Sequence, residues 1–191
     1  GTDTFLLNAR LRITRAEPAV EEVALGDVDA AFGPGTGART PLKRYRFTAA
    51  APTATLTYEG PMDFALSDPK EEYTRGFRDT IGLVGPEGVY LAASSFWHPR
   101  LGHELVTFTM EAAVPEGWHL ISQGNGTSRD AAGRARWDSG GRMDEIYLVG
   151  GPLHLFKDSA GAVEALVYLR EPDGSLANKY LGATAQYIEM Y

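Results

Sequence analysis

The sequence contains no cysteine among its 191 residues. This absence excludes disulfide bonds, thiolate zinc sites and cysteine nucleophiles together. It leaves the compartment open, because many exported bacterial proteins also lack cysteine, so a periplasmic or exported location stands beside a cytoplasmic one. No stretch approaches 18 apolar residues, and we therefore expect no membrane-spanning helix. Residues 1–4 have neither the basic nor the apolar part of a signal peptide, and a start at Gly1 predicts a processed or engineered beginning.

Basic residues are outnumbered by acidic ones. The chain has 18 Lys and Arg against 25 Asp and Glu, which gives a formal net charge of −7. The acidic residues are scattered rather than blocked, a pattern typical of a solubilising surface. Such a chain has no electrostatic attraction for phosphate backbones or anionic lipid, so we expect no nucleic-acid partner. Hydrophobic residues make up 43% of the chain, which is enough for a core in one domain of this length.

Glycine and proline divide the sequence into short segments in which apolar and polar residues alternate. Alternation with a period of two is typical of antiparallel strands that bury one face. The chain is therefore predicted to be all-β, with an antiparallel β-sandwich domain over residues 2–174. The segments 33–41 and 67–73 lack this pattern and are predicted to be loops, the first of them flexible. The predicted strands are residues 5–13, 44–48, 54–60, 88–91, 104–114, 118–122, 134–137, 146–149, 153–157 and 163–169.

The end of the chain changes to a helical period. Residues 172–174 are predicted to form a turn, and Ser175 is predicted to cap an α-helix over residues 175–191. Because the helix starts a new pattern at the end of the sequence, we expect it to connect toward a further domain. The apolar residues that recur at spacings of three and four are Leu176, Tyr180, Leu181, Thr184, Tyr187, Ile188 and Tyr191.

Histidines offer little basis for a metal site. The run from His103 to Thr107 begins like the zinc-peptidase motif H-E-x-x-H, but Thr107 stands where the second histidine is needed. That motif also requires a helix, which places histidines four apart on one face, whereas the following residues favour a strand. The remaining histidines, His98, His119 and His154, show no metal-ligand spacing. We predict no metal and no cofactor in this chain.

Other catalytic patterns are also missing. No serine lies in a G-x-S-x-G elbow, and no glycine-rich phosphate loop follows a predicted strand. The acidic cluster Asp63, Asp68, Glu71 and Glu72 is typical of a solvated loop, since a glycosidase needs two carboxylates opposed across a cleft. The sequence thus predicts that this chain is not itself an enzyme.

Aromatic residues give an alternative function. Trp118 and Trp137 lie in predicted strands, where we expect them to pack in the core. Trp97 belongs to the dense cluster Phe96–Pro99 in a predicted loop, so it is the best candidate for a ligand platform. On this hypothesis the chain is a stand-alone carbohydrate- or peptide-binding β-sandwich module. A lipocalin-like barrel is disfavoured by the terminal helix and the two long loops.

Several segments in the second half of the chain follow one another in an order that resembles a known protein family. The segments are Glu87–Leu91 leading into Ser94–Pro99, Phe108–Trp118 with the ending V-P-E-G-W, Ile121–Gly124, Trp137, Ile146–Leu153 and Tyr180–Tyr191. Together they resemble the N-terminal domain of aminopeptidase N-like zinc metallopeptidases. The resemblance covers about residues 80–191 well and the first half only by strand pattern.

The resemblance implies a large, bent, saddle-like β domain that packs on a separate catalytic domain. The zinc ligands of that family, H-E-x-x-H and a third glutamate, are absent from this sequence, so zinc is expected only in the missing catalytic domain. The chain would then be a non-catalytic domain that shapes the substrate cleft of a zinc metallopeptidase. The implied partners are its own catalytic domain and a peptide substrate. An exposed docking face could also pair two isolated chains as a homodimer.

The family also places substrate-binding chemistry in one loop of this domain. There a Gln or Glu holds the free amine of the substrate, in the loop that corresponds to Ser94–Pro99 here. This sequence has neither residue in that loop, which leaves aminopeptidase specificity unsupported. The substrate-cleft candidates in the loop are Ser95, Trp97 and His98.

Overall fold

The computed structural model describes residues 3–66, 80–102, 105–127 and 133–190. Every strand pairing in this part of the chain is antiparallel, and one long helix, α3, ends it. The predicted all-β fold with a C-terminal helix is therefore confirmed. In chain order the elements are β1 (Thr4–Asn8), β2 (Arg12–Glu17), β3 (Val20–Val23), α1 (Val28–Phe32), α2 (Thr36–Arg39), β4 (Leu42–Phe47), β5 (Thr55–Glu59), β6 (Gly82–Gly85), β7 (Gly88–Leu91), the 3-10 turn η2 (Ala93–Ser95), β8 (Thr109–Ala113), β9 (His119–Ile121), β10 (Asn125–Thr127), β11 (Arg134–Asp138), β12 (Leu148–Gly151), β13 (His154–Ala160), β14 (Val163–Leu169) and α3 (Gly174–Met190).

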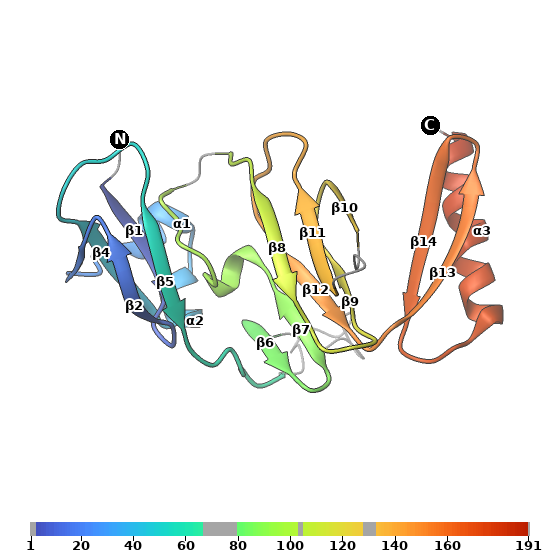
Figure 1. The fold of residues 1–191 in the computed structure, drawn as a ribbon, viewed down its shortest axis with the longest axis horizontal. Coiled ribbons are helices and arrows are strands. Elements are labelled where there is room, and N and C mark those ends of the chain that lie inside the picture. The colour runs from blue at the N-terminus through green and yellow to red at the C-terminus, as the bar shows by residue number, and fades with distance from the viewer. Residues whose placement is uncertain (1–2, 67–79, 103–104, 128–132, 191) are drawn as a thin grey trace.

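The strands form three larger sheets and two two-stranded sheets. The sheets have the orders β1-β4-β3, β6-β7-β12-β9 and β10-β11-β8, and the pairs are β2-β5 and β13-β14. Figure 1 shows the N-terminal strands at one end of the molecule and β13, β14 and α3 at the other, with the other two sheets between them. The chain thus runs from one end of the molecule to the other.

Strand β1 lies at the centre of the packing. Phe5 and Leu7 belong to the larger core cluster, together with apolar residues from β4, β7, β9, β11 and β12. Leu6 belongs to a second cluster with Val28, Leu42 and Phe96. Alternate residues of a strand point to opposite faces, so β1 is buried on both sides. Each buried Leu or Phe of this kind contributes about 1.5–3 kcal/mol by leaving water.

The predicted strand over residues 5–13 is wrong, because the chain turns after Asn8. The Asn8 side chain is completely buried, and its Oδ1 accepts a hydrogen bond of 3.0 Å from the Arg10 backbone N–H. Its Nδ2 donates to the Ser95 carbonyl at 2.8 Å. An asparagine that pairs with its own backbone two residues on favours a turn over a continuing strand. β1 therefore ends at Asn8, and β2 starts separately.

The segment 33–41, predicted to be a flexible loop, instead contains α2 and follows α1. Asp29 organises this segment, because its carboxylate accepts hydrogen bonds from the backbone N–H groups of Gly35 at 2.8 Å and Gly37 at 2.9 Å. Both bonds lower the pKa of Asp29, and the bond from Gly37 has the larger effect. Phe32 at the end of α1 packs against the second core cluster. The other predicted loop, 67–73, lies outside the described residues, as do Asp68, Glu71 and Glu72 of the acidic cluster.

α3 packs against both strands of the β13-β14 hairpin. Its N-cap is Asp173, whose Oδ1 accepts a hydrogen bond of 2.9 Å from the Leu176 N–H, so the predicted cap at Ser175 is wrong. Among the described residues, none from 153–190 belongs to either core cluster. The hairpin and α3 therefore form a unit of their own, the C-terminal unit (residues 153–190). The predicted division of the chain between residues 174 and 175 stays a prediction.

Among the described residues, few specific contacts join the C-terminal unit to the remaining sheets. The rings of His119 in β9 and Tyr168 in β14 lie 5.6 Å apart in an edge arrangement. Arg170 donates a long hydrogen bond of 3.4 Å to the Glu87 carbonyl. These are contacts at the margin of the sheet, not a shared core.

Candidate functional site

The first substrate-cleft candidate, Ser95, has a structural role in this chain. It ends the 3-10 turn η2 and is completely buried. Its hydroxyl donates a hydrogen bond of 2.5 Å to the Ala92 carbonyl, and its own carbonyl accepts from Asn8. The hydroxyl is thus enclosed and already paired, and the serine fixes the turn against β1.

Trp97 is half-buried and packs against the larger core cluster. Its indole N–H donates to the Ile146 carbonyl at 3.1 Å, and its ring meets the His98 ring edge-on at 5.2 Å. A tryptophan held by both its ring and its N–H is typical of structural packing. That these loop residues line a substrate cleft in a larger protein stays a prediction.

His98 is the least satisfied member of the loop. Its Nδ1 lies 3.1 Å from the Pro99 carbonyl, while its buried Nε2 has no hydrogen-bond partner in the described part of the chain. Burial lowers the pKa of His98, and the positive charge of Arg100 acts in the same direction, against the Pro99 hydrogen bond. Burial therefore favours the neutral form of the imidazole.

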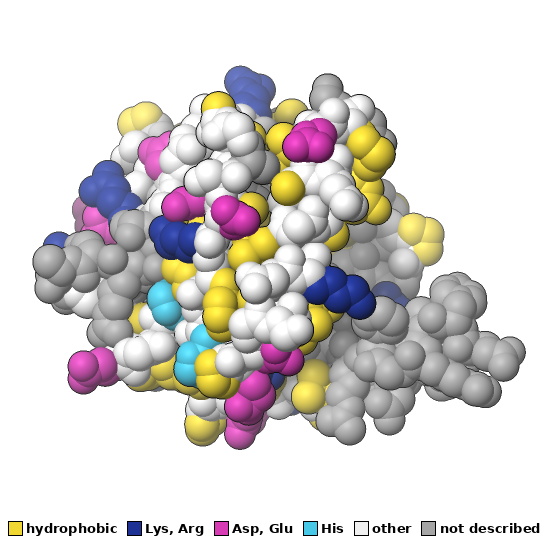
Figure 2. Space-filling model, turned by 90° about the vertical axis from the view of Figure 1, so that its right-hand side faces the viewer, with side chains coloured by type: hydrophobic (Ala, Val, Ile, Leu, Met, Phe, Trp, Pro, Cys, Tyr) yellow, Lys and Arg dark blue, Asp and Glu magenta, His cyan; other side chains and the backbone are white. Residues whose placement is uncertain are grey.

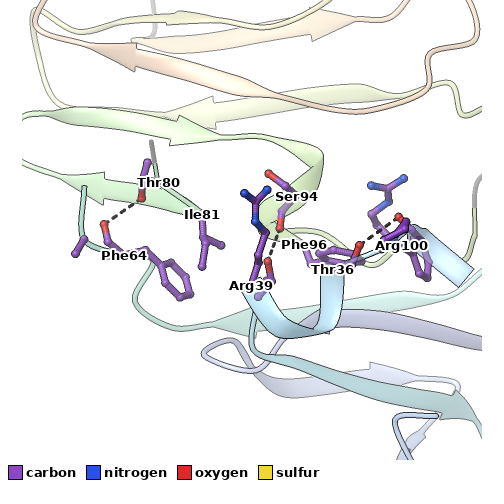
Figure 3. Close-up of a pocket in the computed structure, with 12 residues that line it drawn as sticks. Thr36, Arg39, Phe64, Thr80, Ile81, Ser94, Phe96 and Arg100 are labelled. Atoms are coloured by element: carbon purple, nitrogen blue, oxygen red, sulfur yellow. Dashed lines mark hydrogen bonds between the residues drawn. The ribbon is translucent and has the colours of Figure 1, made fainter. Parts of the chain in front are cut away.

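A pocket of about 650 Å³ opens beside this loop (Figure 3). It lies between the α1-α2 segment, the residues after β5, the start of β6 and the loop around η2. We call it the arginine pocket. It is lined by Phe32, Pro34, Thr36, Arg39, Thr40, Phe64, Ala65, Thr80, Ile81, Ser94, Phe96 and Arg100.

Two arginines give this pocket its charge. Arg39 ends α2 and Arg100 follows the Phe96–Pro99 cluster, and Figure 3 shows both side chains directed to the same side of α2. Within the described residues, no ion pair or hydrogen bond engages either guanidinium. The described residues of the pocket lining include no carboxylate. Among them, none therefore supplies a counter-charge to the two guanidiniums.

Arg100 is held in place by its surroundings. Its backbone N–H and carbonyl both pair with Leu6 at 2.9 Å, and its guanidinium carbon lies 5.5 Å from the ring centroids of Phe32 and Phe96. Burial lowers the pKa of Arg100, whereas the carboxylates of Glu145 and Asp144 raise it. An arginine stays charged at neutral pH despite such a shift. Arg100 is thus a fixed, half-buried cation.

The threonine hydroxyls of the arginine pocket brace its walls. Thr40 donates to the Ser94 carbonyl at 3.0 Å, Thr36 to the Phe32 carbonyl at 3.2 Å and Thr80 to the Phe64 carbonyl at 3.1 Å (Figure 3). The protons of these hydroxyls are committed to the protein. The polar hydrogens left for a ligand therefore belong mainly to the two guanidiniums.

The described residues contain no group of three or more His, Asp or Glu side chains that could hold a metal ion. His103 and Glu104 of the sequence H-E-L-V-T lie outside the described residues. In the part of the chain that the structure describes, no helix has the length and apolar character to cross a membrane.

Arg39 and Arg100 are functional candidates that sequence reasoning missed. Arg39 lies in the segment predicted to be a flexible loop, and Arg100 was not distinguished from other surface arginines. The only sequence signal was that Arg100 directly follows the aromatic cluster Phe96–Pro99. Arg39 and Arg100 line the same pocket because the α1-α2 segment is folded, and no local sequence pattern indicates that fold.

Comparisons with known proteins do not identify a family for this chain. The resemblance to the N-terminal domain of zinc metallopeptidases is based only on the ordered segments between Glu87 and Tyr191. No protein-family model matches the chain, and no curated protein matches it at a significant level.

Proposed function

We propose that this chain is a non-catalytic β domain of a larger zinc-aminopeptidase-like protein, where it packs on the catalytic domain and shapes the substrate cleft. The ordered segments that resemble that family give the proposal its direction. The observation that carries it is an uncovered apolar stripe on α3, in a unit that takes no part in the core clusters of the described chain.

α3 has two apolar stripes rather than one. The inner stripe, Ala177, Leu181, Thr184 and Ile188, is buried or half-buried where the helix packs on the hairpin. The outer stripe consists of Leu176, Tyr180, Tyr187 and Met190, which are 38%, 52%, 63% and 66% exposed. Both stripes follow helical spacings of three, four or seven residues. The two stripes lie side by side, about 100° apart around the helix, so together they form an apolar face wider than the part that packs on the hairpin.

Strand β14 also has exposed apolar side chains, one on each face of the hairpin. Val163 and Leu166 of β14 are 48% and 41% exposed. Lys179 and Glu189 are the only charged residues between Gly174 and Met190. Figure 2 views the end of the molecule on which the C-terminal unit lies, and it shows hydrophobic side chains in a broken band among polar ones. Such a surface is suited to a protein partner.

The occupant that we propose is the catalytic domain of the same protein. The outer stripe offers roughly 400 Å² of apolar area if aromatic and long apolar side chains of this kind bury about 150–250 Å² when fully covered. A stable interface between separate molecules buries about 800 Å² on each partner. A small apolar stripe is sufficient when both surfaces belong to one chain, because linkage raises the effective concentration of the partner. The stripe therefore favours a neighbouring domain over a homodimer.

Trp97 does not favour the alternative of a stand-alone carbohydrate- or peptide-binding module. Its indole N–H is paired and its ring packs on the core. A ligand platform would need that ring face open to solvent.

Sequencing the gene beyond the codon for Tyr191 tests the parent protein directly. We expect H-E-x-x-H and a further glutamate ligand in the residues that follow. The purified 191-residue chain should hydrolyse no aminoacyl amide and bind no stoichiometric zinc by metal analysis. A stop codon directly after Tyr191, or one tight zinc per isolated chain, would contradict the proposal.

Variants of the outer stripe test the docking role. Tyr180→Ser combined with Tyr187→Ser should lower the melting temperature of the longer protein and leave that of the isolated chain nearly unchanged. Tyr90→Ser is the matched control, because Tyr90 is also a tyrosine, 42% exposed, on β7. Equal effects of the double variant on the longer protein and the isolated chain would contradict docking through α3.

A further inference from the structure

We propose that the arginine pocket binds a small organic anion. Its carboxylate or phosphate group lies between Arg39 and Arg100, and its apolar body lies against Phe64 and Ile81. This inference stands on the geometry of the pocket alone and does not depend on the proposed function.

The charge of the arginine pocket selects an anion. The lining carries two guanidiniums and, among these described residues, no carboxylate, although acidic residues outnumber basic ones in the chain as a whole. Taking a cation out of water is costly unless an opposite charge or hydrogen bonds compensate. Arg100 is half-buried and makes no ion pair with the described residues, and the carboxylates of Glu145 and Asp144 act on its charge only from outside the lining. An anionic ligand in the pocket would supply a counter-charge in direct contact with the guanidinium.

The two arginine side chains also indicate which head group the anion has. A guanidinium presents a planar fork of N–H donors that matches a carboxylate or a phosphate in two parallel hydrogen bonds. The Arg100 fork is already positioned, because its backbone is paired with Leu6 and its head group lies near the rings of Phe32 and Phe96. Positioning of this kind reduces the entropy lost on binding. Arg39 is exposed at the end of α2 and can move to close on the ligand.

The size and walls of the arginine pocket indicate an organic body rather than a bare ion. A volume of about 650 Å³ lies within the range of small-molecule sites, about 300–1,000 Å³. Phe64 and Ile81 line the wall opposite the arginines (Figure 3). The Phe64 ring is fixed from behind by Arg10, whose guanidinium carbon lies 4.0 Å from the ring centroid and which pairs with Asp63. Apolar walls with a few convergent polar groups are typical of a ligand site.

Calorimetric titration at low ionic strength, with four probes, tests the proposal. Phenyl phosphate and phenylacetate carry an anion on an aromatic body, inorganic phosphate has the anion alone, and benzyl alcohol has the aromatic body alone. We expect both aromatic anions to bind, with inorganic phosphate at least about tenfold weaker and benzyl alcohol without detectable binding. The tighter of the two aromatic anions identifies the head group, and either order supports the proposal.

Variants locate the binding. Arg39→Gln should weaken the binding of the preferred aromatic anion about tenfold, which corresponds to about 1.4 kcal/mol. Arg136→Gln is the matched control, because Arg136 lies on β11, pairs with Glu111 and does not line the pocket. Arg100→Lys keeps the buried charge but loses the fork, and it should weaken binding with an unchanged circular dichroism spectrum. If Arg100→Lys does not fold, Arg39→Gln decides alone, since Arg39 is exposed.

Several outcomes would each overturn the proposal. They are an unchanged affinity in Arg39→Gln, an equal loss in Arg136→Gln, binding of benzyl alcohol as tight as that of the aromatic anions, and binding of inorganic phosphate as tight as that of phenyl phosphate. An absence of binding by both aromatic anions at millimolar concentration would overturn it as well. None of these results bears on zinc content or on the sequence beyond Tyr191, so the proposed function is tested separately.

Discussion

A buried histidine with one unpaired nitrogen makes the stability of this domain depend on pH. Burial lowers the pKa of His98 below its ordinary value of about 6.5, so between the folded and unfolded values the unfolded chain binds more protons. The free energy of unfolding therefore rises with pH through this window. The stabilising contribution of neutral His98 is fully present above about pH 6.5 and is lost as the pH falls. We expect a lower urea midpoint at about pH 5.5 than at about pH 7.5, and His98→Gln should reduce this difference.

His154→Gln on β13 is the matched control, because His154 is exposed and should leave the pH dependence of the wild type intact. The carboxylate of Asp29 also has a lowered pKa, but its contribution is lost only near and below about pH 4, outside the tested interval. An equal pH dependence in wild type and His98→Gln would show that His98 does not titrate in this way.

Sequence reasoning at the residue scale identified a loop but not the direction of its side chains. Ser95, Trp97 and His98 lie together because they are close in sequence, and that much was predictable. Whether a loop side chain points to solvent or to the core depends on partners far along the chain, such as Asn8 for Ser95 and Ile146 for Trp97. The pairing of Arg39 and Arg100 in one pocket depends in the same way on the fold.

At the scale of elements, the N-cap of α3 is Asp173 in the structure, whereas the sequence pattern predicted Ser175. Asp173 accepts the Leu176 N–H, whereas Ser175 lies inside the first turn. Removing an N-cap side chain costs about 1 kcal/mol. We expect Asp173→Ala to reduce the stability of the C-terminal unit by about that amount, and Ser175→Ala to change it little. Circular dichroism at 222 nm during thermal unfolding measures both, and a larger loss in Ser175→Ala would restore the sequence-based assignment.

Strands with clear alternation were predictable, whereas two short strands that contain glycine, β6 and β10, were missed. The predictions over residues 44–48, 54–60 and 163–169 correspond to β4, β5 and β14. β10 was missed because Gly126 suggests a turn, whereas its role is steric, since a Cβ there would lie 2.1 Å from the Trp137 ring. β6 was missed because it begins and ends with glycine. A Cβ on Gly82 would lie 3.0 Å from both Met62 and Ser95, whereas a Cβ on Gly85 would have no neighbour within 4 Å. A close approach between strands leaves a glycine in the sequence that resembles a turn signal.

At the scale of the whole molecule, the all-β class and the terminal helix followed from periodicity, but the grouping of elements did not. The sequence pattern of α3 merged two stripes into one, since Leu176, Tyr180 and Tyr187 cannot be distinguished from Leu181 and Ile188 by hydrophobicity. The inner stripe packs on the β13-β14 hairpin, and that contact, which depends on tertiary packing, distinguishes it from the outer stripe. The same packing groups the hairpin with the helix rather than with the sheets before it.

The division into a sheet core and a C-terminal unit predicts two levels of stability. Buried apolar contacts set the free energy at which a region opens, and in the described chain residues 153–190 contribute none to the two core clusters. We expect hydrogen exchange, followed by mass spectrometry, to show weaker protection in β13, β14 and α3 than in β1 and β9. Leu181→Ala should reduce protection in the C-terminal unit alone, because Leu181 is buried only in that unit.

Leu7→Ala, the matched substitution in the sheet core, should reduce protection everywhere, since Leu7 is completely buried in the larger cluster on β1. A buried Leu→Ala change costs about 2–5 kcal/mol at either site, so the two variants differ in the region affected and not in the size of the effect. Equal protection across all segments, with Leu181→Ala lowering it in β1 as well, would mean that the chain unfolds as one cooperative unit. The predicted pattern would instead be consistent with the proposal that a further domain covers the outer stripe and adds to the stability of α3 and its hairpin.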